Sequence, residues 1–198
     1  ARTAGLDAVL VDYGFRAPGS PCPKIGRLLD LVRYVREPDG PARALLFDYD
    51  GVVLDSFTAH LRAWQETLGT VGIHLEAADF ARNEGLPTEP MVRLLVQKLL
   101  GRESDRAEAA RLAGVKRKLY ARYLQPRPIP GVLPLLHDLH GRGHWLGLVT
   151  GGVRCDVEAI LGSFGVLGLF RTLVTSEDTA RGKPSPEPYL AAAAALGL

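Results

Sequence analysis

The stretch that decides the fold is Arg43-Ala-Leu-Leu-Phe-Asp-Tyr-Asp-Gly51, a short apolar run that ends in two acidic residues and a glycine. Such a run predicts a buried strand, and the glycine predicts a turn directly after it. In a parallel α/β sheet, ligands bind beyond the carboxyl ends of the strands. Asp48 and Asp50 therefore fall where such a sheet places its functional groups, and alternate residues of an extended segment point to the same side.

The pattern after this stretch changes from a helical block to an alternation of helices and strands. Over residues 57–123 the apolar residues recur at helical spacing, as in Phe57, Leu61, Trp64 and Leu68. From residue 132 onward, strands are expected at Trp145–Val149 and Phe170–Val174, with helices at 132–142, at 156–164 and from a Ser185 cap with Pro186 in the first turn. Alternation predicts a parallel sheet that is covered on both faces. The helical block is expected to be an inserted cap.

The residues before this stretch form a smaller pattern of their own. Ala8–Asp12 predicts a buried strand, and Ile25–Val35 has helical periodicity. A breaker, Glu37-Pro-Asp-Gly-Pro41, then separates them from the strand at Ala44. We therefore expect a strand-plus-helix piece over residues 1–37 and a linker over residues 38–42.

Composition limits the partners that the chain can have. The net charge of the 198 residues is only +2 and the basic residues are scattered, so no nucleic-acid partner is expected. No apolar run is long enough to span a bilayer, so no membrane partner is expected either. The two cysteines, Cys22 and Cys155, show no paired spacing. A reducing, cytoplasmic setting is the one that these features favour.

Three predicted strand ends carry polar groups suited to phosphoryl transfer. Asp48 and Asp50 follow the first, Thr150-Gly-Gly152 follows the second, and Lys183 lies in the loop after the third. One carboxylate can attack phosphorus, and a second can protonate the leaving oxygen and later deprotonate water. A hydroxyl, backbone N–H groups and a lysine can bind the phosphoryl oxygens, and a divalent cation can hold the negative groups together.

These residues resemble the motifs of the haloacid dehalogenase superfamily, in the branch with a helical cap. Residues 48–56 resemble its first motif, Val149-Thr-Gly151 its second and residues 182–189 its third, with Ile129-Pro-Gly131 before the second. The chain is similar to phosphoglycolate phosphatases and β-phosphoglucomutases. The resemblance implies an α/β fold with a Rossmann-like parallel sheet core over residues 43–55 and 129–198, and an inserted α-helical cap over residues 56–128.

The resemblance also implies a role for each motif residue. Asp48 would be the nucleophile and a Mg²⁺ ligand, and Asp50 would be the general acid/base and offer its backbone carbonyl to the metal. Thr150 and the Gly151 N–H would hold phosphate, and Lys183 would neutralise the nucleophile and the phosphate. The resemblance also allows a cis bond between Lys183 and Pro184. Asp50 argues against a dehalogenase, which resembles this family but has no acid at that position. General acid–base help is worth roughly 10²–10⁴-fold, so the second aspartate discriminates between the two activities.

Four residues of the cap are candidates for substrate contact, each with a structural alternative. His60 and Trp64 stand at the spacing found in β-phosphoglucomutases, but a cap-core role for Trp64 and a hinge-side polar role for His60 are favoured over it. Arg82 and Glu84 precede Gly85 in an expected cap loop, which could face substrate or solvent.

One family motif is missing in its usual place. A fourth motif, with acidic residues that bind Mg²⁺, is expected after the third, but the chain ends at Leu198. Residues 1–16 resemble the segment that comes after the fourth motif in the family. A circular permutation with a deletion, a junction of two tandem copies or a lost segment would each produce this order. The missing strand would sit between the strands at Ala8 and Ala44, which must then pair directly or be filled by another chain.

The sequence therefore favours a Mg²⁺-dependent phosphohydrolase of small phosphorylated metabolites that works through an aspartyl-phosphate. One alternative is a β-phosphoglucomutase-like sugar-phosphate mutase, although Thr88 stands where the mutase pattern has an arginine. The other is a catalytically incomplete fragment with a binding or assembly role. A homodimer that restores the sheet is a further possibility.

Overall fold

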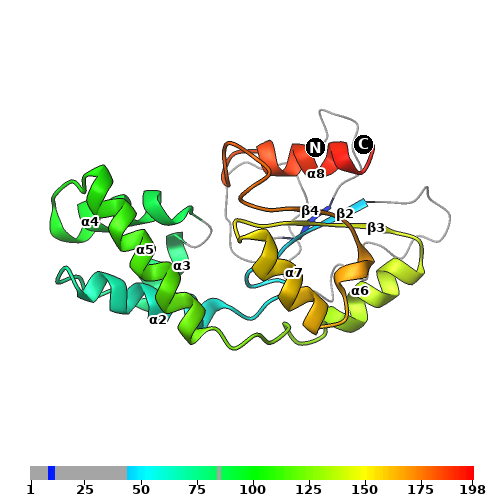
Figure 1. Ribbon diagram of the computed structural model, residues 1–198, viewed down its shortest axis with the longest axis horizontal. Helices are drawn as coiled ribbons and strands as arrows, with labels where there is room; N and C mark the ends of the chain where they lie inside the picture. Colours follow the sequence, from blue (N-terminus) through cyan, green and yellow to red (C-terminus); the bar gives the residue numbers. More distant parts are fainter. Residues whose placement is uncertain (1–8, 12–43, 84–85) are drawn as a thin grey trace. The chain divides into compact units, whose positions relative to one another are not determined.

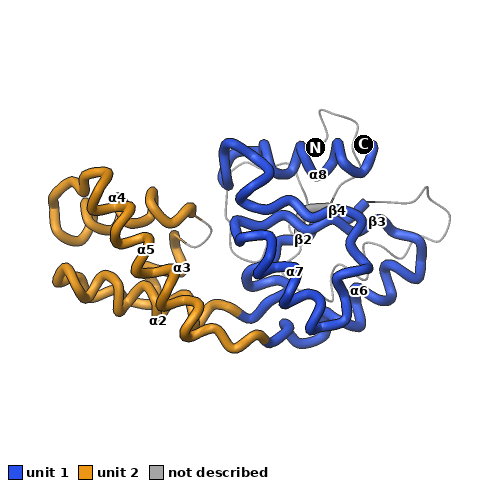
Figure 2. Tube along the Cα trace, in the orientation of Figure 1, with its two compact units in different colours: residues 1–55, 127–198 blue, residues 56–126 orange. Residues whose placement is uncertain are grey.

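The computed structural model describes residues 9–11, 44–83 and 86–198, and the chain divides into two compact units (Figures 1 and 2). One unit comprises Ala1–Asp55 and Arg127–Leu198, and the other comprises Ser56–Pro126. The expected helix at Ile25–Val35, the linker over residues 38–42 and Glu84 lie outside the described residues. Within the described part, no helix combines the length and the apolar character needed to cross a bilayer.

The first unit is built on a parallel sheet with strand order β1-β2-β3-β4. Every neighbouring pair runs parallel, which confirms the predicted α/β class. The strands are β1 (Val9–Val11), β2 (Ala44–Asp48), β3 (Trp145–Val149) and β4 (Phe170–Val174). In the register of β2 and β3, Asp48 pairs with Val149, so two strand ends lie side by side at one edge of the sheet.

The short strand β1 pairs directly with β2. Val9 aligns with Leu45 and Val11 with Phe47, in parallel. Of the two arrangements that the sequence left open for these strands, direct pairing is the one that the structure adopts, and it gives β2 a neighbour on both sides.

Helices cover both faces of this sheet, as parallel strands require. Figure 1 shows α8 (Glu187–Ala195) on one face, and α6 (Val132–Gly141) and α7 (Arg154–Ser163) on the opposite face. A short 3₁₀ turn, η2 (Leu167–Leu169), leads into β4. Alternate residues of β2 point to opposite faces, and the core under α8 is formed by Ala44, Leu46, Val149, Val174, Ala192 and Leu196.

The start of α8 differs from the prediction. Pro186, rather than Ser185, occupies the cap position, and the proline within the first turn is Pro188. The Ser185 hydroxyl still accepts a hydrogen bond from the Glu187 N–H at 3.3 Å. Ser185, one residue before the cap position, therefore provides an acceptor for the Glu187 N–H, which has no partner within the helix.

The second unit is all-helical, with α2 (Phe57–Gly69), α3 (Ala77–Asn83), α4 (Thr88–Leu100) and α5 (Arg106–Tyr123). Gly101 ends α4 with a φ of +67°, which glycine adopts without steric cost. Asp105 begins α5, and its side chain accepts a 2.7 Å hydrogen bond from the Glu108 N–H. The apolar stripes meet in one core, which is formed by Trp64, Leu68, Ile73, Leu75, Phe80, Met91, Val92, Leu95, Val96, Ala109 and Leu112.

Arg82 was expected in a loop, but it lies in the last turn of α3. Two interactions with Asp79 stabilise this helix: the Arg82 guanidinium pairs with its carboxylate at 2.9 Å, and the Asn83 side-chain amide donates to its backbone carbonyl at 2.7 Å. Phe80 anchors the same turn in the core of the unit. The prediction missed this helix because seven residues, about two turns, with a single buried aromatic residue give too short a periodic pattern.

Candidate active site

The site begins at the end of β2, where Asp48 meets a lysine from a distant part of the sequence. The Lys183 Nζ donates to the Asp48 Oδ1 at 2.5 Å and to the Val149 carbonyl oxygen at 3.0 Å. Both side chains of the ion pair are 19% exposed. Because Asp48 and Val149 are register partners, one ammonium group bridges the ends of β2 and β3.

The electrostatics of Asp48 result from opposing effects. Burial raises the pKa of its carboxyl group, the positive charge and hydrogen bond of Lys183 lower it, and the nearby charge of Asp50 raises it again. The Tyr49 N–H also donates to the Asp48 Oδ1, at 2.7 Å. Burial prevails, so the pKa of Asp48 lies above its usual range, and Lys183 is the side chain that most favours the ionised form.

A tight turn positions Asp50 just beyond Asp48. The Tyr49 carbonyl oxygen accepts hydrogen bonds from the N–H groups of residues 52, 53 and 54. Gly51 has a φ of +73°, a conformation that a residue with a Cβ rarely adopts. The turn returns the chain to Leu54, which forms an isolated bridge with Asp50. Two carboxylates are thereby held at the end of one strand.

The loop after β3 supplies Thr150, which is buried. Its N–H donates to the Val174 carbonyl at 2.8 Å, and its hydroxyl accepts from the Gly152 N–H at 3.0 Å. Gly151 lies between them and is exposed. The structure thus brings Asp48, Asp50, Thr150, Gly151 and Lys183 to the loops at one end of the parallel strands.

The groups that could hold a cation after β2 are the Asp48 carboxylate and the Asp50 backbone carbonyl oxygen. Over residues 9–11, 44–83 and 86–198, no group of three or more His, Cys, Asp or Glu side chains gathers in a way that could hold a metal. Mg²⁺ usually binds proteins through one or two carboxylates, while water and substrate phosphate complete its octahedral shell. Asp48 and Asp50 therefore fit an ion that binds together with a phosphorylated substrate.

The loop of Lys183 has a cis peptide bond between Lys183 and Pro184, as the resemblance allowed. Comparison with known proteins now decides the family. The family description "haloacid dehalogenase-like hydrolase" matches residues 42–198. The chain is a member of the haloacid dehalogenase-like hydrolases. The family prediction made from the motifs is confirmed.

Individual relatives of this haloacid dehalogenase-like hydrolase include two phosphatases. The validoxylamine A 7′-phosphate phosphatase of Streptomyces hygroscopicus subsp. limoneus is 30% identical, over 79% of this chain and 72% of that protein. The fructose-1-phosphate phosphatase of Escherichia coli is 26% identical, over 78% of this chain and 80% of that protein. A β-phosphoglucomutase structure from Clostridium difficile is 22% identical, with a TM-score of 0.65, and covers 80% of this chain and 72% of its own; it shows the shared fold.

The second unit of the hydrolase holds the remaining site candidates. Trp64 is 2% exposed and belongs to the core of that unit. The His60 Nδ1 lies 2.7 Å from the Lys116 Nζ, and its ring stacks on Tyr120 with centroids 4.1 Å apart. Arg82 is exposed on α3. The substrate roles of these residues stay predictions.

Lys116 is a residue that the sequence patterns did not single out. It is only 6% exposed, and its ammonium group lies 4.8 Å from the ring centroid of Tyr120 and 5.6 Å from that of Trp64. The sequence did contain a pattern that could have identified Lys116 as buried, because it follows the buried Leu112 and Ala113 at helical spacing on α5. A charged residue on an apolar stripe is unusual enough to mark a polar cluster.

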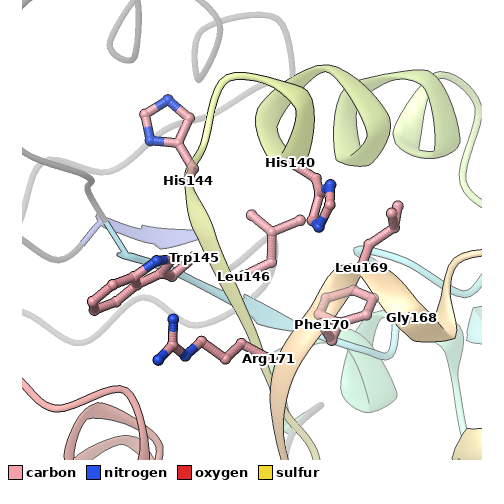
Figure 3. A pocket seen from close by; sticks show the side chains of 8 residues that line it. All are labelled: His140, His144, Trp145, Leu146, Gly168, Leu169, Phe170 and Arg171. Carbon is pink, nitrogen blue, oxygen red and sulfur yellow. The ribbon is translucent and has the colours of Figure 1, made fainter.

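A hollow of about 370 Å³ lies at the end of the strands opposite to Asp48 and Lys183. It is lined by His140, His144, Trp145, Leu146, Gly168, Leu169, Phe170 and Arg171 (Figure 3). Trp145 and Phe170 are the first residues of β3 and β4, whereas Asp48 and Val149 are the last of theirs. The hollow has no carboxylate in its lining and lies at the edge where parallel sheets do not place their active sites.

Proposed function

We propose that this chain hydrolyses phosphate esters of small metabolites with the help of Mg²⁺, through an aspartyl-phosphate formed on Asp48. The observation that carries the proposal is the contact between Lys183 and Asp48 at the end of β2, with a second carboxylate two residues away. Family membership supports it, because the family is one of hydrolases. The two phosphatase relatives support the choice of a phosphorylated substrate.

In the first half-reaction, an oxygen of the Asp48 carboxylate attacks phosphorus. A bond forms between that oxygen and phosphorus, and the bond from phosphorus to the alcohol oxygen of the substrate breaks. Asp50 gives its proton to the departing oxygen, which leaves as the neutral alcohol. Asp50 ends this half-reaction as a carboxylate.

In the second half-reaction, Asp50 accepts a proton from water while the water oxygen attacks phosphorus. The acyl phosphate bond breaks, orthophosphate leaves, and Asp48 is again a carboxylate. Each carboxyl group returns to its starting protonation state. Two carboxylates in different environments are thereby assigned opposite tasks, which is how many hydrolases divide acid and base chemistry.

The groups around the two carboxylates bind the phosphoryl oxygens. The Lys183 ammonium offsets negative charge on Asp48 and on the phosphate, and the Thr150 hydroxyl with the Gly151 N–H donates to the oxygens. Asp48 and Asp50 would hold Mg²⁺, which supplies further neutralisation of the phosphate charge when bound. Preorganised donors of this kind are each worth about 10²–10³ in rate.

The substrate class is inferred from the relatives as a proposal. The two phosphatases described above are named for small phosphorylated compounds, and one of these compounds is a sugar phosphate. We infer that the chain acts on a phosphate ester of similar size. Two alternatives remain: a sugar-phosphate mutase and a catalytically incomplete binding or assembly protein. The mutase would form an isomer of its substrate, and the incomplete protein would form no product.

The experiment that tests the proposal measures Mg²⁺-dependent release of phosphate from p-nitrophenyl phosphate. Asp48→Asn should lower turnover by about three orders of magnitude or more, because it removes the nucleophile. Asp138→Asn makes the same chemical change at an exposed pair with Arg142 on α6 and should leave turnover unchanged. Chelation of Mg²⁺ should abolish turnover, and added Mg²⁺ should restore it.

Each alternative predicts a different result. A mutase would convert a sugar phosphate into its isomer without releasing phosphate. A catalytically incomplete chain would show no turnover with Mg²⁺, and Asp48→Asn would change nothing. Either result would contradict the proposed hydrolysis.

A further inference from the structure

Lys183 reaches the active site from a loop without regular secondary structure. Residues 175–186, here called the lysine loop, connect the end of β4 to the start of α8. The lysine ammonium must nevertheless stay within hydrogen-bond distance of both Asp48 and Val149. A misplacement of about 1 Å in such a site can cost about 10²-fold in rate. Specific hydrogen bonds or ion pairs must therefore hold the backbone of this loop in one conformation.

Asp178 organises the first part of the lysine loop. Its Oδ2 accepts hydrogen bonds from the Thr175 N–H, from the Thr175 hydroxyl and from the Arg154 Nη2, each at 2.7 Å. Arg154, the first residue of α7, also donates to the Leu173 carbonyl at 3.1 Å. The hydrogen bonds from Thr175, and then the one from Arg154, hold the pKa of Asp178 below its usual range. The loop therefore starts from a charged anchor attached to both β4 and α7.

The same anchor reaches the loop that carries Thr150. Ser176 donates to the Gly152 carbonyl oxygen through both its N–H and its hydroxyl, each at 3.1 Å. The Asp178 carboxylate accepts the hydrogen bond from the Thr175 N–H and so fixes the backbone one residue before Ser176. The positions of the two loops that would bind phosphate are therefore set by one another, and Asp178 is the charged group at their junction.

Glu187 organises the second part of the lysine loop. Its Oε1 accepts from the Ala180 N–H at 2.8 Å and from the Arg181 N–H at 3.4 Å, and its Oε2 accepts from the Arg181 Nε at 2.9 Å. Glu187 is the first residue of α8, which packs against β3 and β4. The backbone two residues before Lys183 is thus tied to a helix of the core.

We propose that Asp178 and Glu187 are positioning residues, which hold the lysine loop from its two ends so that Lys183 meets Asp48. This inference rests on the proposed function for its kinetic consequence, but its structural part stands without it. Neither carboxylate is assigned a contact with substrate. Each acts through the placement of Lys183.

The control is Glu177, which lies beside Asp178 in the same loop. Its side chain is exposed and makes no hydrogen bond or ion pair with the residues that the structure describes. Glu177→Gln removes one negative charge, as Asp178→Asn does in the same loop and Glu187→Gln does at the start of α8. A general effect of charge would appear in all three variants, whereas positioning predicts an effect in only two.

The first readout is the reactivity of Lys183 toward acetic anhydride, followed by mass spectrometry of the full chain after digestion. Lys118 is exposed and serves as the internal reference; the buried Lys116 reports any global unfolding. Asp178→Asn and Glu187→Gln should raise the relative labelling rate of Lys183 by roughly two- to fivefold, as expected for the loss of one partly exposed ion pair. Glu177→Gln should match the wild type, and Lys116 should not change in any variant.

The second readout is steady-state hydrolysis of p-nitrophenyl phosphate with Mg²⁺. Asp178→Asn and Glu187→Gln should lower kcat by about 10- to 100-fold with a smaller change in KM, because Lys183 is misplaced when charge develops. Unchanged Lys183 labelling in both variants would overturn the proposal, and so would altered labelling with an unchanged kcat. If the wild type has no turnover at all, the proposed function fails, and the labelling result alone then supports or overturns the positioning role.

Discussion

The Lys183 ammonium lies 2.5 Å from the Asp48 carboxylate although 135 residues separate the two in the sequence. Parallel strands cause this meeting, because their carboxyl ends all reach the same edge of the sheet. The pair places a cation beside the carboxylate that is proposed to attack phosphorus.

Removal of the Lys183 charge should move the pH dependence of hydrolysis. Lys183 lowers the pKa of Asp48, so in Lys183→Ala this pKa rises further above its usual range. Asp48 must be ionised to attack, and the acid limb of kcat/KM should therefore shift to higher pH. We expect kcat/KM at its optimum to fall by about 10²–10³. A pH–rate profile from about pH 5 to 9 measures both effects.

Lys183→Arg keeps the positive charge and is the control for that experiment. It should shift the acid limb less than Lys183→Ala does, even if its larger head group lowers kcat. An acid limb at the same pH in all three proteins would show that Lys183 does not govern the ionisation of Asp48.

The Thr150 hydroxyl should matter for hydrolysis more than its methyl group does. In Thr150→Ala the Gly152 N–H loses its 3.0 Å acceptor, and the substrate loses a proposed donor. We expect kcat/KM to fall by about tenfold to a hundredfold, the usual cost of a hydrogen bond to a charged group. Thr150→Ser keeps the hydroxyl and should retain most of the activity. Equal losses in the two variants would assign the effect to packing.

Gly147 should be intolerant of any side chain. A Cβ built at this position in β3 would lie 2.6 Å from the Leu46 Cδ2 and 3.0 Å from the Thr172 Cγ2. We expect Gly147→Ala to lower the free energy of unfolding by about 1–3 kcal/mol, as overpacking of a core does. Urea denaturation followed by circular dichroism measures the change.

Gly162 provides the matched control for that substitution. It lies within α7, and a Cβ there would meet no atom within 4 Å. Gly162→Ala should therefore raise the free energy of unfolding, by up to about 1 kcal/mol, through helix propensity. Destabilisation of similar size in both variants would contradict the steric explanation for Gly147.

The cap of α5 should contribute measurably to the stability of the second unit. Asp105→Ala removes the acceptor of the Glu108 N–H and should cost about 0.5–2 kcal/mol in the free energy of unfolding. Asp105→Asn keeps an acceptor at the same position and should cost less. Thermal unfolding of the two variants under identical conditions distinguishes the loss of the cap from a general effect of charge. Equal losses of stability in the two variants would favour the effect of charge.

Local sequence patterns were sufficient for most of the described elements. The strands at Trp145–Val149 and Phe170–Val174 have the predicted bounds, because a short apolar run between turn signals leaves a buried strand few ways to shift. The short helix that contains Arg82 was missed, and the start of α8 was displaced, because helix ends depend on side-chain contacts as well as on periodicity.

By itself, the sequence determined the family, the α/β class and the candidates Asp48, Asp50, Thr150 and Lys183, because each is marked by its neighbours along the chain. Only the tertiary structure decided that Lys183 bridges Asp48 and Val149. The tertiary structure likewise decided that Asp178 ties the lysine loop to β4 and α7 through Thr175 and Arg154. It also decided that Gly147 lies against Leu46. These contacts depend on strand register and on the course of loops, which join residues far apart in the chain and leave no periodic trace in it.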